Sequence, residues 1–255
     1  MLSESNKKEL AALALAQYPK ECCAFILKDG SFIPLENIHD KPEGNFLIKN
    51  SDYIKYSDQL ACVAHSHTDD DCTPSFTDMC VQVSSSIPWV IAGTNGVVCN
   101  RFVVFGNTVI KKDWIGVDFI HGVNDCYSLI RNYFYHHHNA LLPDFPRSNK
   151  WWEKEHKSMY LDHYPEAGFV PAKYENLSDL VIGDLIFMRL GRTNTINHAG
   201  VYMGDGIFAH HMCDQLSRKE PIYRYKDKIE KVVRYDKDGE IARRNGERVR
   251  RAILL

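Results

Sequence analysis

Residues 198–211 read HAGVYMGDGIFAHH, two short apolar runs joined by Gly204-Asp205-Gly206. Glycine-rich turns of this length join antiparallel strands, so the stretch predicts a β-hairpin that brings its histidines side by side. A further strand is predicted at 231–235, and a helix precedes both at 125–135. A helix followed by a meander of strands is typical of an α+β fold, which is the class that we expect here.

The first 112 residues predict a separate, compact α/β unit. Its apolar residues recur at three- and four-residue steps in two segments, which predicts two helices. They form short runs in five other segments, which predicts five strands. The expected helices are 4–18 and 75–85, and the expected strands are 22–27, 32–35, 60–64, 89–92 and 97–105. Residues 46–60 give no clear pattern, and 136–175 are expected to form an irregular or helical insertion. We expect a short connection between the units near 108–117.

Composition limits the classes of function. The 255 residues include 31 basic and 33 acidic side chains, a net charge of −2 that offers no electrostatic case for nucleic acid. No run reaches the roughly 18 apolar residues that a membrane span needs. The start of the chain lacks the features of a signal peptide, so we expect a cytoplasmic protein. None of its eight cysteines form C-x-x-C pairs, which favours free thiols over disulfides or a structural zinc cluster.

Residues 64–78, AHSHTDDDCTPSFTD, combine histidines, aspartates and hydroxyl groups. His65 and His67 are two apart, so on an extended segment both imidazoles point to one side. With Asp78 they would supply the three protein ligands of a catalytic zinc site. Zinc would lower the pKa of a bound water molecule to about 7, and a general base such as Glu21 would accept its proton.

The same residues also have a purely structural interpretation. Ser75-Phe76-Thr77-Asp78 matches a capping box before an apolar helix, and two histidines at a strand end could be ordinary surface residues. Spacing alone leaves the metal site and the capped helix open. In either case we expect residues 69–72 to form a solvated loop and not to bind metal.

The spacing H-x-H-x7-S-x2-D, with a glutamate before an upstream strand in PKECCAF, resembles the JAMM (MPN+) metalloproteases over roughly residues 1–112. The resemblance implies zinc ligation by His65, His67 and Asp78, proton transfer by Glu21 and oxyanion stabilisation by Ser75. Thr68 departs from the pattern, because many members have proline there, and this affects the stiffness of the loop more than the chemistry.

Cys126 lies at the start of the predicted helix 125–135, with Asn124 or Asp125 as its cap. The helix dipole and free N–H groups at this position favour the thiolate and predict a lowered pKa. A thiolate needs an imidazole partner and an orienting group, and the hairpin offers His198 and His210. Taken singly, each of these residues is better explained as a packing residue.

DCYSLIR at 125–131, GDLIF at 183–187 and the hairpin together resemble the NlpC-type papain-like cysteine peptidases over residues 113–236. The resemblance implies that Cys126 is the nucleophile, that His198 is the general base and that His210 orients it. His211 competes with His210 for the third position. Tyr127 replaces the usual small residue, and Asp184 is interpreted as a structural turn or cap residue.

The two domains, in this order and size, resemble the lambda-type tail tip assembly proteins of siphophages. The resemblance implies a dual peptidase that cleaves tail proteins, peptidoglycan stem peptides or both, in the host cytoplasm during assembly or in the virion tail tip. Its expected partners are phage tail tip proteins, with peptidoglycan as a further candidate. A structural component with vestigial sites and a wall hydrolase acting only at DNA entry stay open. The basic tail, 237–255, is expected to be a solvated end with a frayed or paired strand at its last residues.

Overall fold

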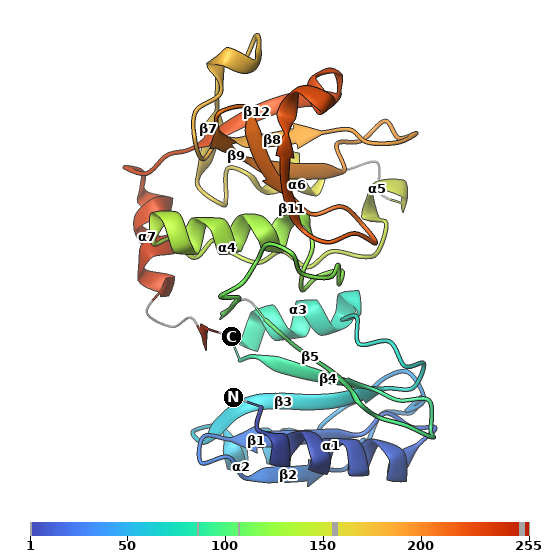
Figure 1. The fold of residues 1–255 in the computed structure, drawn as a ribbon. Coiled ribbons are helices and arrows are strands. Elements are labelled where there is room, and N and C mark those ends of the chain that lie inside the picture. The colour runs from blue at the N-terminus through green and yellow to red at the C-terminus, as the bar shows by residue number, and fades with distance from the viewer. Residues whose placement is uncertain (1, 86, 107, 155–157, 250–252, 255) are drawn as a thin grey trace. The chain divides into compact units, whose positions relative to one another are not determined.

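The structure, a computed structural model, divides into two compact units, Met1–Asn107 and Thr108–Leu255 (Figure 1). The residues that it describes are 2–85, 87–106, 108–154, 158–249 and 253–254. Each unit contains its own sheet with flanking helices, which confirms the expected α+β class. Within these residues, no helix combines the length and the apolar character that crossing a bilayer requires.

The first unit is built on a five-stranded sheet in the order β2-β1-β3-β4-β5. The strands are β1 (Cys23–Leu27), β2 (Phe32–Leu35), β3 (Leu60–His67), β4 (Trp89–Gly93) and β5 (Arg101–Phe105). β3 and β4 run parallel and the other neighbours are antiparallel. β5 starts later than the predicted 97–105, because the Asn95 side chain accepts from the N–H groups of Val97 and Val98 and extends the turn.

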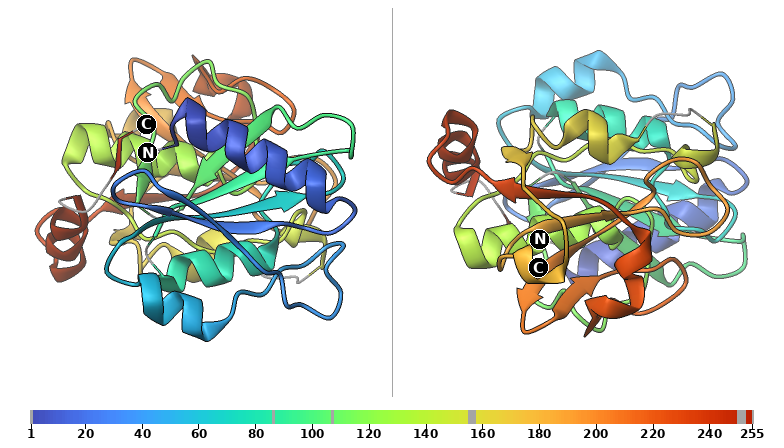
Figure 2. Two further views of the ribbon diagram at one scale, coloured as in Figure 1. Left: turned by 90° about the horizontal axis from the view of Figure 1, so that it is seen from below. Right: turned by 90° about the horizontal axis from the view of Figure 1, so that it is seen from above.

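Helices cover both faces of this sheet, with α1 on one side and α2 and α3 on the other (Figure 2, left). The helices are α1 (Glu4–Gln17), α2 (Asn50–Tyr56) and α3 (Phe76–Ser85). Ser3 caps α1 in a capping box, and α1 buries Leu10 and Ala14 against β1, β3 and β4. α2 occupies the segment without a clear pattern; none of its residues is fully buried, so little apolar periodicity marked it.

The alternation of β3 decides where its histidines lie. Ala64 belongs to the core beneath α1. Because successive side chains of a strand point to opposite faces, His65 and His67 lie on the other face, together with α3. The β3–α3–β4 crossover therefore brings the end of one strand and the start of one helix to the same side of the sheet.

The second unit is built on a six-stranded antiparallel sheet in the order β11-β10-β9-β8-β12-β7. The strands are β7 (Phe169–Pro171), β8 (Leu185–Met188), β9 (His198–Gly204), β10 (Ile207–His210), β11 (Arg218–Pro221) and β12 (Ile229–Tyr235). Two 3-10 helices, η1 (Leu177–Asp179) and η2 (Ile222–Lys228), adjoin them. The predicted hairpin is confirmed as β9 and β10, and α4 (Cys126–His138) packs Ile130 and Phe134 into the core on one face of the sheet.

The described residues of the insertion at 136–175 are partly helical, which agrees with one of the two expectations. It contains two short helices, α5 (Trp151–Lys154) and α6 (Met159–His163), and it adds β7 to the edge of the sheet beside β12. Its aromatic residues, including Trp151 and Tyr160, belong to the main core of this unit. Part of the segment therefore contributes to the interior of this unit.

The basic tail forms a helix where none was expected, but most of its described residues are exposed, which agrees with the expected solvated end. Helix α7 (Glu240–Val249) buries Ala242 and Asn245. Asn245 donates to the carbonyl of Ala167, and its own carbonyl accepts from Leu141 N–H. β13 (Ile253–Leu254) pairs in parallel with β6 (Val109–Ile110), which confirms the expected paired strand for these two residues. Residues 250–252 and 255 of the tail lie outside the described residues. These contacts with Ala167 and Leu141 cannot be read from the sequence of the tail alone.

Two candidate active sites

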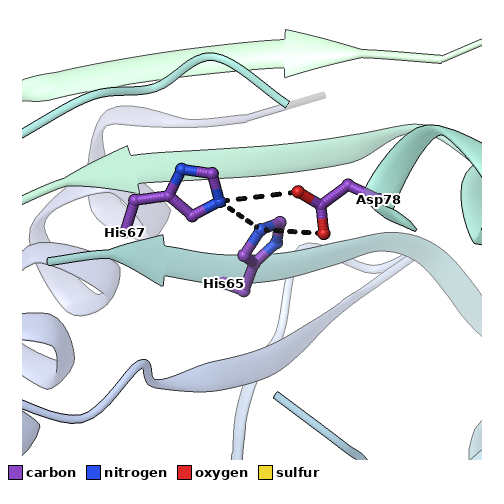
Figure 3. Close-up of side chains that lie close together, drawn as sticks. All are labelled: His65, His67 and Asp78. Atoms are coloured by element: carbon purple, nitrogen blue, oxygen red, sulfur yellow. Dashed lines mark hydrogen bonds and ion pairs between the residues drawn. The ribbon is translucent and has the colours of Figure 1, made fainter. Parts of the chain in front are cut away.

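Three predicted metal ligands lie together in the first unit. β3 supplies His65 and His67, and the first turn of α3 supplies Asp78 (Figure 3). The two imidazole Nε2 atoms are 3.2 Å apart. One carboxylate oxygen of Asp78 is 3.6 Å from His65 Nε2, and the other is 3.5 Å from His67 Nε2. All three donor atoms lie within 4.8 Å of one another, which is the convergence that a single cation needs.

The surroundings of His65 fit a metal ligand. Its ring is fully buried, stacks on Phe46 with centroids 4.5 Å apart and meets Trp89 edge-on. Its Nε2 is the ring nitrogen that faces His67 and Asp78. Two imidazoles and one carboxylate form a donor set that zinc accepts in catalytic sites, which leave one position open. The residues present therefore fit zinc.

Electrostatics hold Asp78 ionised between the two rings. Burial alone would raise the pKa of the Asp78 carboxyl, but its hydrogen bonds with both histidines outweigh burial and hold this pKa far below its usual range. Burial lowers the pKa of His65. Burial also opposes protonation of His67, but its hydrogen bond with Asp78 prevails and raises the pKa of that ring.

The capping and metal interpretations describe the same residues. Ser75 Oγ accepts from Asp78 N–H at 3.1 Å, and Asp78 Oδ2 accepts from Ser75 N–H at 2.7 Å. This reciprocal pair starts α3 and fixes the direction of the Asp78 side chain. The cap therefore positions the carboxylate beside the histidines.

Glu21 and Ser75 line a cavity of about 670 Å³ together with His67 and Asp78. Glu21 precedes β1, and its backbone is fixed by hydrogen bonds with Pro42 and Asn37. Burial raises the pKa of the Glu21 carboxyl to about 7, and the Asp78 charge adds to the shift. A carboxyl group with this pKa can take up and release a proton near neutral pH.

The loop between the histidines and α3 is only partly solvated. Asp69 and Asp71 are exposed, and each accepts from a backbone N–H two residues on. Cys72 is buried, with its thiol 3.4 Å from the carbonyl of Arg101, so the expectation of a solvated loop is wrong at this position. Thr68 donates to the carbonyl of Glu43, which ties the loop down where many JAMM members have proline.

The second candidate site starts at the N-terminus of α4. Of the two predicted caps, Asp125 is the N-cap, and it accepts from Ser128 N–H at 2.9 Å. Cys126 is one of eight cysteines that are all free. The expected lowering of its pKa is wrong: burial raises the pKa of the Cys126 thiol to about 11, and the adjoining Asp125 carboxylate adds to this. The helix terminus is present, but the low-dielectric surroundings and a neighbouring negative charge dominate.

Arg147 is a residue that sequence reasoning missed. Its guanidinium donates to both carboxylate oxygens of Asp125, at 2.7 and 3.0 Å, and to Ser128 Oγ at 3.1 Å. Nη1 donates to Asp144 and to the carbonyl of Phe145. The buried ion pair locks the insertion to the helix cap beside Cys126. No motif marks Arg147, because its partner lies 22 residues earlier in the chain.

Tyr160 was missed as well. It lies on α6 and donates its hydroxyl to Cys126 Sγ at 2.9 Å. The aromatic richness of the insertion was visible in the sequence, but only the fold shows which of these rings reaches the sulfur. Cys126, Tyr160 and His198 line a hollow of about 130 Å³.

His198 and His210 are joined in the hairpin. His198 Nε2 lies 2.9 Å from His210 Nδ1, and His210 Nε2 lies 2.5 Å from Glu220 Oε1. His211 instead faces the carbonyl of Gln215, so His210 is the ring placed against the predicted base. Among the described residues no hydrogen bond joins Cys126 to His198. Cys126 and His198 line the same hollow. Cys126 is a neutral thiol there, and burial holds the pKa of the His198 imidazole well below its usual value.

Asp184 has the structural role that was expected. Its side chain accepts from Val181 N–H at 2.8 Å and forms a two-point ion pair with Arg234 at 2.7 and 2.8 Å. These contacts fix the entry to β8 and join it to β12.

Two family models match the chain, one in each unit. The model of prokaryotic homologs of the JAB domain matches residues 3–104, and the NlpC/P60 family model matches residues 114–234. The NlpC/P60 match indicates a hydrolase of the peptidase type, and the JAB match is compatible with the metal-ligand cluster in the first unit.

Curated relatives match across most of the chain. The Tail tip assembly protein K of Escherichia phage N15 is 27% identical over 233 residues, covering 89% of this chain and 92% of that protein. The Tail tip assembly protein K of Escherichia phage lambda is 33% identical over 174 residues, covering 67% of this chain and 77% of that protein.

Solved structures show weaker similarity. A protein from Salinibacter ruber aligns with a TM-score of 0.30 at 15% identity, over 41% of this chain and 79% of its own. The NlpC/p60 domain of the peptidoglycan hydrolase SagA aligns with a TM-score of 0.30 at 14% identity, over 47% of this chain and 88% of its own. An NlpC/P60 family protein from Bacillus cereus aligns with a TM-score of 0.33 at 14% identity. The alignment covers 89% of this chain and 66% of that protein.

Proposed function

Because this chain belongs to the tail tip assembly protein K family, we propose that it acts in phage tail tip assembly as a peptidase with two separate sites. One observation supports the proposal: predicted site residues of each unit line a hollow of that unit, namely Glu21, His67, Ser75 and Asp78 in the first and Cys126 and His198 in the second. The substrates are peptide bonds in tail tip proteins, in peptidoglycan stem peptides or in both. The protein acts in the host cytoplasm during assembly, and a place in the virion tail tip follows if it stays with its substrate.

In the first unit, His65, His67 and Asp78 would hold zinc. Zinc bound there would act as a Lewis acid and would make a water molecule nucleophilic near neutral pH. Glu21, with its pKa of about 7, takes up a proton from the attacking water and passes it to the leaving amine. Ser75 lines the same cavity, and its hydroxyl group stabilises the oxyanion of the substrate.

In the second unit, Cys126 is the nucleophile. His198 accepts the thiol proton as Cys126 Sγ forms a bond to the scissile carbonyl carbon, and it then gives this proton to the departing amine as the C–N bond breaks. Water hydrolyses the resulting thioester and restores the thiol. His210 holds His198 in orientation through its 2.9 Å contact. Both rings are neutral at pH 7, because burial lowers their pKa values, so His198 is ready to act as a base.

The test is incubation of the full chain with purified tail tip proteins and, separately, with purified peptidoglycan, with cleavage read by mass spectrometry. Asp78→Ala and Cys126→Ala serve as single-site variants. Each product is expected to vanish in one variant and to persist in the other. Cleavage that neither variant reduces would refute the proposal. Normal assembly and infection by phage carrying either variant would favour a structural component with vestigial sites, and complete particles that penetrate walls poorly would favour a hydrolase acting only at DNA entry.

A further inference from the structure

Glu220 forms the outer end of a line of side chains that starts at His198. It lies on β11, next to β10, where His210 pairs with Arg218 and Phe208 with Glu220. Its Oε1 accepts from His210 Nε2 at 2.5 Å, from Arg218 Nε at 2.9 Å and from the Tyr225 hydroxyl at 2.9 Å. His210 is fully buried and the Glu220 side chain is 11% exposed. A carboxylate with three donors on one oxygen is held firmly in place.

The charge of Glu220 decides which nitrogens carry protons. Burial alone would raise the pKa of Glu220, but hydrogen bonds from Tyr225, Arg218 and His210 lower it, so the side chain is an ionised acceptor near neutral pH. An ionised carboxylate can only accept, so His210 Nε2 must donate. His210 is neutral, because burial lowers its pKa to about 4, and its Nδ1 is therefore an acceptor. His198 Nε2 must then donate to it, which leaves Nδ1 of His198 without a proton.

We propose that Glu220 is a positioning residue of the thiol site, which fixes the tautomer of His210 and, through His210, that of His198. The base nitrogen available to Cys126 is then Nδ1 of His198 in every molecule. The inference rests on the proposed function of this site, where a single correct tautomer is needed for proton transfer.

Other charged groups also act on the rings of His198 and His210 and affect the pH dependence of this line. Arg218 opposes protonation of both rings, as does His211, whereas Glu220 favours protonation of His210. The titratable and charged groups that face the line of His198, His210 and Glu220 are His211, Arg218, Arg224 and Tyr225. Glu220 is the acidic group among them that contacts a ring directly.

The first test is nitrogen NMR of the histidine rings in the full chain, for the wild type, Glu220→Ala and the near-isosteric Glu220→Gln. In the wild type His198 and His210 are each expected to show one Nε2–H tautomer. In the variants, donor and acceptor of the hydrogen bond between His198 and His210 can exchange, so nitrogen shifts averaged over the two tautomers are expected. Unchanged shifts in a variant with wild-type circular dichroism would overturn the proposal. If Glu220→Ala does not fold, Glu220→Gln decides.

The second test is the pH dependence of Cys126 alkylation by iodoacetamide, followed by peptide mass spectrometry. Loss of the Glu220 charge makes His198 a weaker base, so the midpoint should move to higher pH and the rate at pH 7 should fall roughly tenfold. The matched control is Glu230→Gln on β12, where Glu230 pairs with Arg189 at 2.8 Å. A lower melting temperature with an unmoved alkylation profile would mean a merely structural role and would refute the inference. Neither readout needs a substrate. Absence of peptidase activity would therefore refute the proposed function, whereas the NMR and alkylation results would still decide the role of Glu220.

Discussion

The hydroxyl of Tyr160 donates a hydrogen bond of 2.9 Å to Cys126 Sγ, from a helix that lies inside the insertion. This bond lowers the pKa of the thiol against the effect of burial, so its loss should make the thiolate rarer. We expect Tyr160→Phe to slow the alkylation of Cys126 at pH 7.5 by about threefold to tenfold, the equivalent of one ordinary hydrogen bond. Peptide-resolved mass spectrometry over time measures the rate.

Tyr164→Phe is the matched control for this substitution. Tyr164 caps the same helix at its C-terminus, and its ring packs against Phe187 with centroids 6.2 Å apart. The control should leave the Cys126 rate unchanged. Equal slowing in both variants would attribute the effect to helix packing instead of the hydroxyl group.

Asp78→Asn should abolish zinc binding while it keeps the shape of the side chain. An amide oxygen is a weaker ligand than a carboxylate, and the two imidazoles alone do not complete a catalytic zinc site. Elemental analysis after dialysis is expected to give about one zinc per wild-type chain and none for the variant.

Ser75→Ala removes the hydroxyl half of the reciprocal cap, so it should cost about 1 kcal/mol of stability and keep the zinc. Loop carboxylates are tested by Asp71→Asn, and zinc loss there would contradict the assigned ligand set.

The sequence predicted best the features that depend on neighbours in the chain. The hairpin at 198–211, the cap at Asp125 and the histidines on one side of β3 all follow from local periodicity and turn chemistry. Helix α7 was missed because its burial depends on contacts with Ala167 and Leu141, which are far away in the sequence. Long-range packing of this kind leaves little trace in a local pattern.

The same distinction holds for the sites. Motif spacing brought the three metal ligands into one group, because strand and helix geometry constrain residues that are close in sequence. Arg147, Tyr160 and Glu220 reach their partners only through tertiary packing, and none of them belongs to a motif. The pKa of Cys126 was predicted in the wrong direction for a related reason, since its burial depends on the whole domain.

Arg147→Leu should destabilise the second unit by about 3–5 kcal/mol, because it leaves the Asp125 carboxylate buried without its cation. Arg147 and the other hydrogen bonds hold the pKa of Asp125 below its ordinary 3.8, although burial opposes this. A depressed pKa means that the unfolded state binds the proton more readily, so the pair stabilises the fold above pH 3.8 and the gain is lost as the pH falls below that value. Urea unfolding should therefore show a difference between wild type and variant that is largest at pH 6 and shrinks toward pH 2. A constant difference across this range would count against the ion pair.

Glu21→Gln should stabilise the zinc-free protein at high pH. Burial raises the pKa of the Glu21 carboxyl from 4.5 to about 7, so the folded state binds this proton more readily than the unfolded state. The resulting stabilisation is complete below pH 4.5 and is lost as the pH rises toward 7. Glutamine keeps the shape and cannot ionise, so in EDTA the variant should match the wild type at pH 4 and unfold at higher urea concentration at pH 8. Glu43→Gln, an exposed position that lines the same cavity, should show no such gain. Equal urea midpoints for Glu21→Gln and wild type at pH 8 would mean that Glu21 ionises without cost, which would remove the physical reason for treating it as a base poised near neutral pH.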